Sequence, residues 1–256
     1  MTVYFEEYGD KSAPLMLFLH GGGVSGWMWE KQIQHFASHY YCVVPDLPGH
    51  GRNTKDTYFS IEDAAEKTIK QLESLSGNRK IIVVGFSLGA QILVQLLSMR
   101  PNLVDYAVIT SALVRPMSLM TKWIRPTMKM TSPLIAMRAF SKIQAKTLSI
   151  PSQKFEQYYE ESCQMRQETL TRILEENLSF TIPENFKDVQ TSMLVMVGEQ
   201  EKSMMKKSMM DLVNSNRQCK GMLVADIGHG ISLAKPAFFN VTIENWLQDL
   251  SSIENL

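Results

Sequence analysis

The sequence predicts an α/β protein: a mostly parallel sheet of about seven strands with helices on both faces. Apolar runs of strand length recur along the chain, helical stretches separate them, and 256 residues with 45% apolar content can bury one large core. A length near 250 fits one large domain, or one domain with a substantial insertion. Two independent domains are compatible with this length but not required.

The strands are predicted where short apolar runs are bounded by turn residues. They fall, in chain order, at residues 3–8, 15–19, 41–45, 80–85, 106–110, 193–197 and 222–225. Helices are predicted between them at about 27–37, 88–99, 202–214 and 236–250. Another helix follows Ser60, which with Asp63 forms a capping box, and it ends at Gly77, where a left-handed backbone is tolerated.

The segment 117–183 interrupts the alternation of strands and helices. It contains no convincing buried strand, is rich in Met, Lys, Gln and Glu, and has helical periodicity. A structureless loop of that length is improbable in a compact domain. We therefore predict a core of residues 1–116 and 184–256, with a helical insertion formed by 117–183.

The strongest chemical signal is Gly85-Phe86-Ser87-Leu88-Gly89, which follows an apolar strand and precedes a helical sequence. So tight a turn needs small residues around the serine, and it lifts the hydroxyl above the sheet edge. The start of the helix adds free amides that favour negative charge. Ser87 is therefore the predicted nucleophile, and the Leu88 amide is a predicted donor to an oxyanion.

A second glycine-rich turn, His20-Gly21-Gly22-Gly23, also leaves a strand. Glycines let the backbone approach a substrate, so the Gly22 amide is the predicted second oxyanion donor, with Gly23 as the neighbouring candidate. A turn without any ligand is the alternative. His20 stands at the strand end, where a ring usually bonds to the backbone, and we do not expect it to be catalytic.

The base is expected in Asp226-Ile227-Gly228-His229-Gly230, directly after the last strand, because flanking glycines let His229 swing toward Ser87. His229 needs an acid to fix its tautomer. Glu199 and Glu201 both follow the sixth strand; the turn after Gly198 favours Glu201 over Glu199, and Asp226 or no acid at all are the remaining alternatives.

The remaining histidines are not expected in the site. His35 and His39 are spaced to share a helix face, but no third metal ligand accompanies them. His50, in Asp46-Leu47-Pro48-Gly49-His50-Gly51, belongs to a turn after the third strand and is expected to be structural.

Taken together in this order, these motifs resemble the α/β-hydrolase fold superfamily over nearly the whole chain. The order nucleophile, acid, histidine is the one this fold uses. The resemblance implies that a cap occupies 117–183 and that the usual eight strands are reduced to seven. The superfamily more often has Asp where this chain has Glu201.

The residues and the resemblance together predict a serine hydrolase that cleaves a small neutral, largely apolar ester, thioester or lactone through an acyl-enzyme. Carbon–carbon bond hydrolysis or lyase chemistry with the same triad is the enzymatic alternative. A receptor or interaction protein with little turnover is the alternative from another class. Beside Gly23, the expected substrate-binding side chains come from the second loop and the cap: Trp27, Met117, Met120 and Trp123.

Charge and cysteine content bound the partners. The chain has 26 basic and 26 acidic side chains, so we expect a small-molecule substrate, no nucleic acid and no membrane partner, and we leave a homodimer open. No cofactor and no metal site are expected. The N-terminal residues lack the pattern of a signal peptide, and three widely spaced cysteines argue against disulfides. These features predict a cytoplasmic protein.

Overall fold

A computed structural model describes residues 4–55 and 58–254 of the chain. Its centre is a seven-stranded sheet with the order β1-β3-β2-β4-β5-β6-β7. The strands are β1 (Phe5–Tyr8), β2 (Leu15–Leu19), β3 (Tyr41–Pro45), β4 (Ile81–Phe86), β5 (Tyr106–Thr110), β6 (Ser192–Gly198) and β7 (Cys219–Val224). Only β1 runs antiparallel to its neighbour; the other five pairs are parallel. Val3, where the first strand was predicted to begin, lies outside the described residues.

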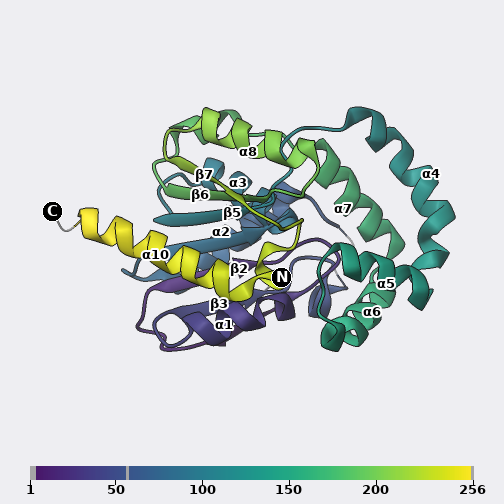
Figure 1. The fold of residues 1–256 in the computed structure, drawn as a ribbon, viewed down its shortest axis with the longest axis horizontal. Helices are drawn as coiled ribbons and strands as arrows, with labels where there is room; N and C mark the ends of the chain where they lie inside the picture. The colour runs from purple at the N-terminus through teal and green to yellow at the C-terminus, as the bar shows by residue number, and fades with distance from the viewer. Residues whose placement is uncertain (1–3, 56–57, 255–256) are drawn as a thin grey trace.

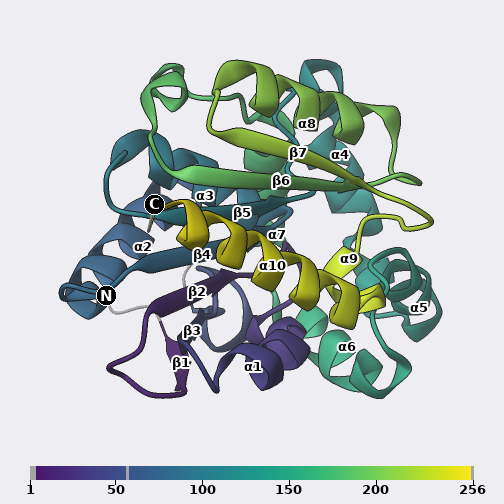
Figure 2. The ribbon, with the colours of Figure 1, turned by 60° about the vertical axis from the view of Figure 1, so that its left-hand side comes forward.

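Helices cover both faces of the sheet (Figures 1 and 2). One face carries α2 (Ile61–Ser76), α3 (Leu88–Met99) and α8 (Ser203–Ser215), and the other carries α1 (Glu30–Phe36) and α10 (Pro236–Glu254). Successive side chains of a strand point to opposite faces. Leu17 accordingly packs in the first of these layers, whereas Met16 and Phe18 pack in the second, and all three are fully buried. The predicted fold class is confirmed.

The ends of the helices follow local rules. The Ser60 hydroxyl accepts a hydrogen bond from the Asp63 amide at 3.1 Å, which caps the first turn of α2. The Asp63 carboxylate lies 2.9 Å from the Lys67 ammonium, so the predicted capping box forms in one direction. Gly77 ends the helix with a φ of 53°, in the left-handed region that glycine tolerates.

Four helices occupy the interval between β5 and β6: α4 (Ser118–Ile135), α5 (Arg138–Thr147), α6 (Phe155–Gln164) and α7 (Gln167–Ser179). They lie together beyond one end of the strands, with α4 outermost (Figure 1). Short 3-10 turns fall at Gly26–Trp29, Gly51–Asn53, Ser152–Lys154 and Glu184–Asp188, and a short helix α9 spans Ile231–Ala234.

Polar contacts on both sides join the four helices to the core. The side-chain amides of Gln91 on α3 and Asn177 on α7 are 2.7 Å apart, and Gln91 also donates to the Asn177 carbonyl at 2.9 Å. On the other side, the Trp27 indole N–H donates to Glu161 of α6 at 2.9 Å. These contacts fix α7 and α6 above the carboxyl ends of the strands, where Ser87 lies.

Candidate active site

Ser87 stands between β4 and α3 with a φ of 52°, a conformation that is strained for a residue with a side chain. The turn is tight because its glycines allow close backbone contacts. A Cβ at Gly89 would lie 2.3 Å from the Leu19 carbonyl oxygen, and one at Gly85 would lie 2.7 Å from the Gly89 carbonyl oxygen. These contacts give the physical reason for the small residues on both sides of the serine.

The structure brings Ser87, His229 and Glu201 into one hydrogen-bonded line. Ser87 Oγ lies 3.1 Å from His229 Nε2, and His229 Nδ1 lies 2.7 Å from Glu201 Oε2. Because a carboxylate only accepts, Nδ1 carries the proton and Nε2 is left to accept from the serine hydroxyl. The Glu201 side chain is 2% exposed and the His229 side chain 27% exposed. This is the arrangement of a nucleophile, a base and an acid.

Glu201 is held by more than the histidine. Its Oε1 accepts from the Ser111 hydroxyl at 2.7 Å and from the Gly198 amide at 3.0 Å. Burial raises the pKa of Glu201, but the hydrogen bond and charge of His229, with the bonds from Ser111 and Gly198, outweigh burial and hold the pKa below its usual value. The carboxylate is therefore ionised where it faces the imidazole.

Ser111 was not predicted from the sequence. It follows β5 directly, is buried, and has a φ of 54°, so its backbone is strained like that of Ser87. Since β5 is the neighbour of β6 in the sheet, the end of β5 lies beside the loop that carries Glu201. Only the strand order reveals this proximity.

We expect Ser111→Ala to lower kcat about tenfold, because the carboxylate loses one charge-assisted hydrogen bond. Ser111→Gly should lower kcat equally while unfolding at a higher temperature than the alanine variant, since glycine relieves the left-handed strain. Turnover and thermal unfolding of both variants check this. Normal kcat in the glycine variant would show that the backbone, not the hydroxyl, matters.

Glu199, the alternative acid, lies elsewhere. Its carboxylate accepts from the Asp226 amide at 3.2 Å, and its own amide donates to the Val224 carbonyl at 2.8 Å. Asp226 itself has a φ of 56°, in the turn after β7. Glu199 thus stabilises the loop that carries His229, through its hydrogen bond with the Asp226 amide.

The two predicted oxyanion donors are neighbours. A Cβ on Gly22 would lie 3.7 Å from Leu88 Cδ2, and both residues line the same cavity as Ser87. Leu88 is the first residue of α3, and a first-turn amide has no acceptor within its own helix. Two backbone N–H groups beside the serine are the usual elements of an oxyanion hole.

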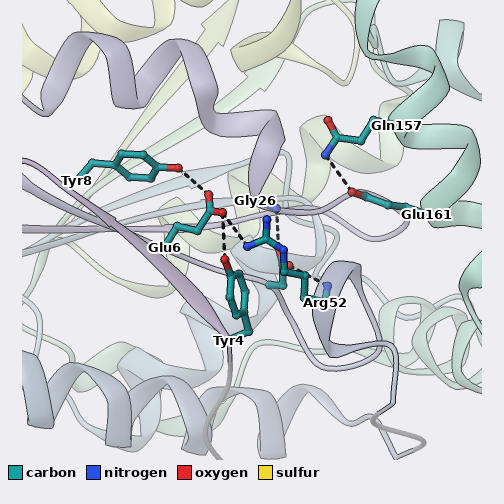
Figure 3. A network of polar contacts seen from close by, with 8 residues as sticks. Tyr4, Glu6, Tyr8, Gly26, Arg52, Gln157 and Glu161 are labelled. Carbon is teal, nitrogen blue, oxygen red and sulfur yellow. Dashed lines mark hydrogen bonds and ion pairs between the residues drawn. The ribbon is translucent and has the colours of Figure 1, made fainter.

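Asp46, in the turn after β3, fixes the loop that carries Gly22. Its carboxylate accepts from the Gly26 amide at 2.9 Å and from the Arg52 amide at 3.0 Å. The two donor residues, Gly26 and Arg52, are labelled in Figure 3. A Cβ on Gly26 would lie 2.8 Å from Val44 of β3 and 3.3 Å from Asp46 Oδ1, so only glycine fits this close contact. The sequence placed Asp46 in a turn motif but did not indicate this bridge.

His20 and His50 are both completely buried, with ring centroids 5.1 Å apart. The Leu47 amide donates to His20 Nε2 at 2.8 Å, so His20 Nδ1 donates to the Gly21 carbonyl. Burial lowers the pKa of His20 to about 4, and burial together with the charge of His20 lowers that of His50 to about 3. Both rings are neutral supports of the loops around the site.

These two histidines should make stability depend on pH. Below their unfolded pKa of about 6.5, the unfolded chain takes up protons that the folded protein excludes, so stability falls as pH falls toward the folded values. The expected loss is about 3 kcal/mol between pH 6.5 and pH 5, because the slope for each ring rises toward about 1.4 kcal/mol per pH unit only as the unfolded histidine becomes fully protonated. Urea unfolding over this range measures it.

His50→Gln should halve this slope, whereas His39→Gln, at an exposed position, should leave it unchanged. The slope is the readout, so a general loss of stability in the His50 variant does not affect the comparison. Equal slopes in the two variants would contradict the assignment.

A cavity of about 430 Å³ lies over Ser87. Its walls come mainly from the four helices between β5 and β6, and its lining is uncharged: Gly22, Gly23, Ser87, Leu88, Met128, Thr131, Ile135, Phe140, Ile143, Gln144, Thr147, Leu148, Tyr158, Ser162, Met165, Leu170, Ile173, Leu174 and Asn177. This volume is in the range of small-molecule sites.

Of the predicted substrate-binding residues, only Gly23 lines this cavity. Trp27 is engaged with Glu161, and Met117 stands at the start of α4 with its amide bonded to the Leu178 carbonyl. Met120 and Trp123 are 51% and 69% exposed. These four side chains do not line the cavity over Ser87.

The orientation of α4 about its own axis explains why Met120 and Trp123 do not face the cavity. This helix has two apolar faces, and the one that holds Met128, Thr131 and Ile135 lines the cavity. The sequence did not show which of the two faces turns inward.

The chain is similar to proteins of known fold. A sequence model of the family described as alpha/beta hydrolase fold matches residues 14–130. A solved structure, described as a carboxylesterase of the ammonia-oxidizing thaumarchaeon Nitrososphaera gargenis, superposes with a TM-score of 0.80 and 15% identity. The alignment covers 98% of this chain and 95% of that one. This chain has the α/β-hydrolase fold. The fold that the motifs imply is confirmed.

Curated relatives match this α/β-hydrolase-fold protein over part of their length. The magnesium-chelatase 30 kDa subunit of Rhodobacter capsulatus is 38% identical over 90 residues, which are 34% of this chain and 31% of that protein. Methylesterase 18 of Arabidopsis thaliana is 31% identical over 123 residues, 46% of this chain and 47% of that protein. The matches thus span less than half of each relative.

The helices and the metal-ligating side chains bear on the expected partners. None of the helices in residues 4–55 and 58–254 has the length and apolar content needed to cross a bilayer. Within the same residues, histidine, cysteine and carboxylate side chains do not form a cluster suited to a metal ion. His35 instead lies 3.4 Å from the Glu244 carboxylate.

Proposed function

We propose that this α/β-hydrolase-fold protein is a serine hydrolase that cleaves a small neutral, largely apolar carboxylic ester, thioester or lactone through an acyl-enzyme. The observation that carries the proposal is the line from Ser87 Oγ through His229 to the buried Glu201, at 3.1 and 2.7 Å, on the floor of an uncharged cavity. The printed name of the Arabidopsis relative, a methylesterase, supports ester chemistry.

The geometry supports the following steps. Ser87 Oγ attacks the carbonyl carbon while His229 Nε2 takes the hydroxyl proton, and the Glu201 carboxylate stabilises the resulting imidazolium. The Gly22 and Leu88 amides hold the negative oxygen of the tetrahedral intermediate. His229 returns its proton to the leaving oxygen or sulfur, and the acyl group stays on Ser87. Water, deprotonated by His229, then releases the acid. This chemistry requires no cofactor.

The cavity supports the choice of substrate. Apolar side chains such as Met128, Phe140 and Leu170 dominate its lining, and its polar groups are uncharged amides and hydroxyls such as those of Gln144 and Tyr158. Tyr158 is buried, with its hydroxyl 3.4 Å from the Gln144 side-chain oxygen. A charged substrate would lose hydration without gaining a counter-charge. We further propose that the helices over the cavity move to admit the substrate.

An activity panel tests the proposal. Aryl esters of increasing acyl length, acyl thioesters, lactones and a ring-cleavage diketone are compared on the wild type and on Ser87→Ala. We expect Ser87-dependent hydrolysis of neutral esters, thioesters or lactones, at least about tenfold faster than hydrolysis of anionic analogues, because no cation in the lining compensates their charge.

The other outcomes are informative. Preference for anionic substrates would refute the assignment of the cavity. Ser87-dependent cleavage of the diketone, with inert esters, would assign carbon–carbon bond hydrolysis instead. If no substrate turns over while ligands still bind the cavity, the protein is a receptor.

A further inference from the structure

The outer side of α4 and α5 concentrates exposed apolar side chains. In the described part of the chain, eight large hydrophobic side chains are more than half exposed, and six of them lie between residues 119 and 143. These six are Leu119, Met120, Trp123, Met130, Met137 and Ile143. Exposed apolar side chains that gather on one part of a surface mark an interaction site. We refer to these six side chains as the cap stripe.

Four of the six side chains of the cap stripe belong to α4, and three of these four follow one side of the helix. Leu119, Trp123 and Met130 are four and seven residues apart, so they lie along the same side of the helix. Ile124 and Met128 are buried and lie on a different side. One apolar face of α4 is therefore buried. The face that carries Leu119, Trp123 and Met130 is a second apolar face, and the described residues leave it exposed.

Basic residues accompany the cap stripe. Residues 106–155 include no acidic residue but eight basic ones: Arg115, Lys122, Arg125, Lys129, Arg138, Lys142, Lys146 and Lys154. Four of these pair with acidic side chains from other segments, as Arg125 does with Glu175. Lys122, Lys129 and Lys146 are exposed, and no described carboxylate lies within ion-pair distance of them. The surface of α4 and α5 is thus both apolar and cationic.

We infer that the cap stripe and its lysines dock onto the surface of an anionic lipid bilayer. A helix with exposed Trp, Leu and Met on one side and Lys and Arg beside them lies in the plane of a membrane interface. Its lysines can reach the headgroups while their stems cover apolar surface. A row along an 18-residue helix, about 27 Å long, fits a flat and deformable partner.

The same two helices also line the cavity over Ser87. Met128 and Ile135 of α4 contribute to its wall, and Ile143 of α5 both lines it and is 68% exposed. An apolar molecule could pass from the bilayer to the cavity along this side. The docking itself does not depend on the proposed hydrolase activity.

The expectation of no membrane partner came from the equal totals of basic and acidic residues. That total averages over an uneven distribution. The segment 106–155 is purely basic, whereas the following segment supplies Glu156, Glu160 and Glu161. Local charge near the surface, and not the net charge of the chain, governs attraction within a Debye length of about 10 Å.

Vesicle sedimentation tests the inference directly. The wild type is mixed with vesicles of phosphatidylcholine alone, or with about one-third phosphatidylglycerol, at about 0.05 M and 0.5 M salt. We expect at least about tenfold stronger binding to the anionic vesicles, falling at high salt. The fluorescence of Trp123 should shift to shorter wavelength on binding, and Trp123→Ser should weaken binding about tenfold.

A charge-reversed variant and a matched control identify the surface. The variant is Lys122→Glu/Lys129→Glu/Lys146→Glu. The control is Lys70→Glu/Lys187→Glu/Lys220→Glu, which makes the same change in net charge at exposed positions away from α4 and α5. Binding should fall about a hundredfold or more in the variant. It should fall much less in the control.

Several results would overturn the inference. These are absence of binding to anionic vesicles, equal binding to both kinds of vesicle, and equal losses in the variant and the control. A wild type that ignores vesicles but forms a dimer, dissociated by Trp123→Ser, would assign the cap stripe to contact between copies. Binding only to an acidic protein would likewise exclude the bilayer.

Discussion

Ser87→Ala is expected to lower turnover by about four to six powers of ten on any substrate that the wild type cleaves. The hydroxyl is the atom that forms the covalent intermediate, and His229 Nε2 lies 3.1 Å from this hydroxyl, so it is positioned to take the proton from Ser87. The measurement is kcat on the best substrate of the panel. In parallel, a fluorophosphonate probe should label the wild type on the peptide that contains Ser87 and should not label the variant.

Ser98→Ala provides the matched control, because Ser98 is a buried serine of the same helix whose hydroxyl bonds to the Val94 carbonyl. It should keep full labelling and turnover. The outcome that refutes Ser87 as the nucleophile is a probe adduct that survives Ser87→Ala, or residual esterase activity near that of the wild type.

Glu201→Gln is expected to lower turnover by roughly 10⁴. The amide keeps the size of the side chain but loses the charge that stabilises the imidazolium, and its NH₂ group can face His229 Nδ1 and favour the wrong tautomer. Because the acid lies in a buried network with Ser111 and Gly198, thermal unfolding must accompany the kinetics.

Glu199→Gln is the matched comparison. A glutamine there keeps an oxygen that can accept from the Asp226 amide, so we expect turnover within about threefold of the wild type. If Glu199→Gln is the inactive variant and Glu201→Gln is active, the acid has been assigned to the wrong carboxylate.

Much of the fold could be predicted because its signals are local. Four of the strands and helices, among them Leu15–Leu19 and Leu88–Met99, begin and end where the sequence predicts. Buried strands of a parallel sheet are continuous apolar runs, and glycine or serine marks their ends. The positions of Ser87 and His229 follow from the same signals. Ser87 directly follows β4 with a glycine two residues away on either side, and His229 lies between two glycines in the turn after β7.

The contacts of the site that join distant segments could not be predicted. Ser111 reaches Glu201 because β5 and β6 are adjacent, and Asp46 reaches Gly26 because β3 and β2 are adjacent. Periodicity identifies strands but does not give their order. The cavity wall was missed for a related reason: the apolar residues of α4 occupy two faces, and composition does not tell which face meets Ser87.

The origin of the cavity wall has an evolutionary consequence. The reacting groups belong to the loops after β2, β4, β6 and β7, whereas the side chains above them, from Met128 to Asn177, belong to one uninterrupted stretch of chain. Substitutions within that stretch can alter which molecule is admitted while the bond-breaking apparatus is preserved. Substrate selectivity can therefore change through substitutions in the helices over the cavity, while the residues that break the bond stay the same.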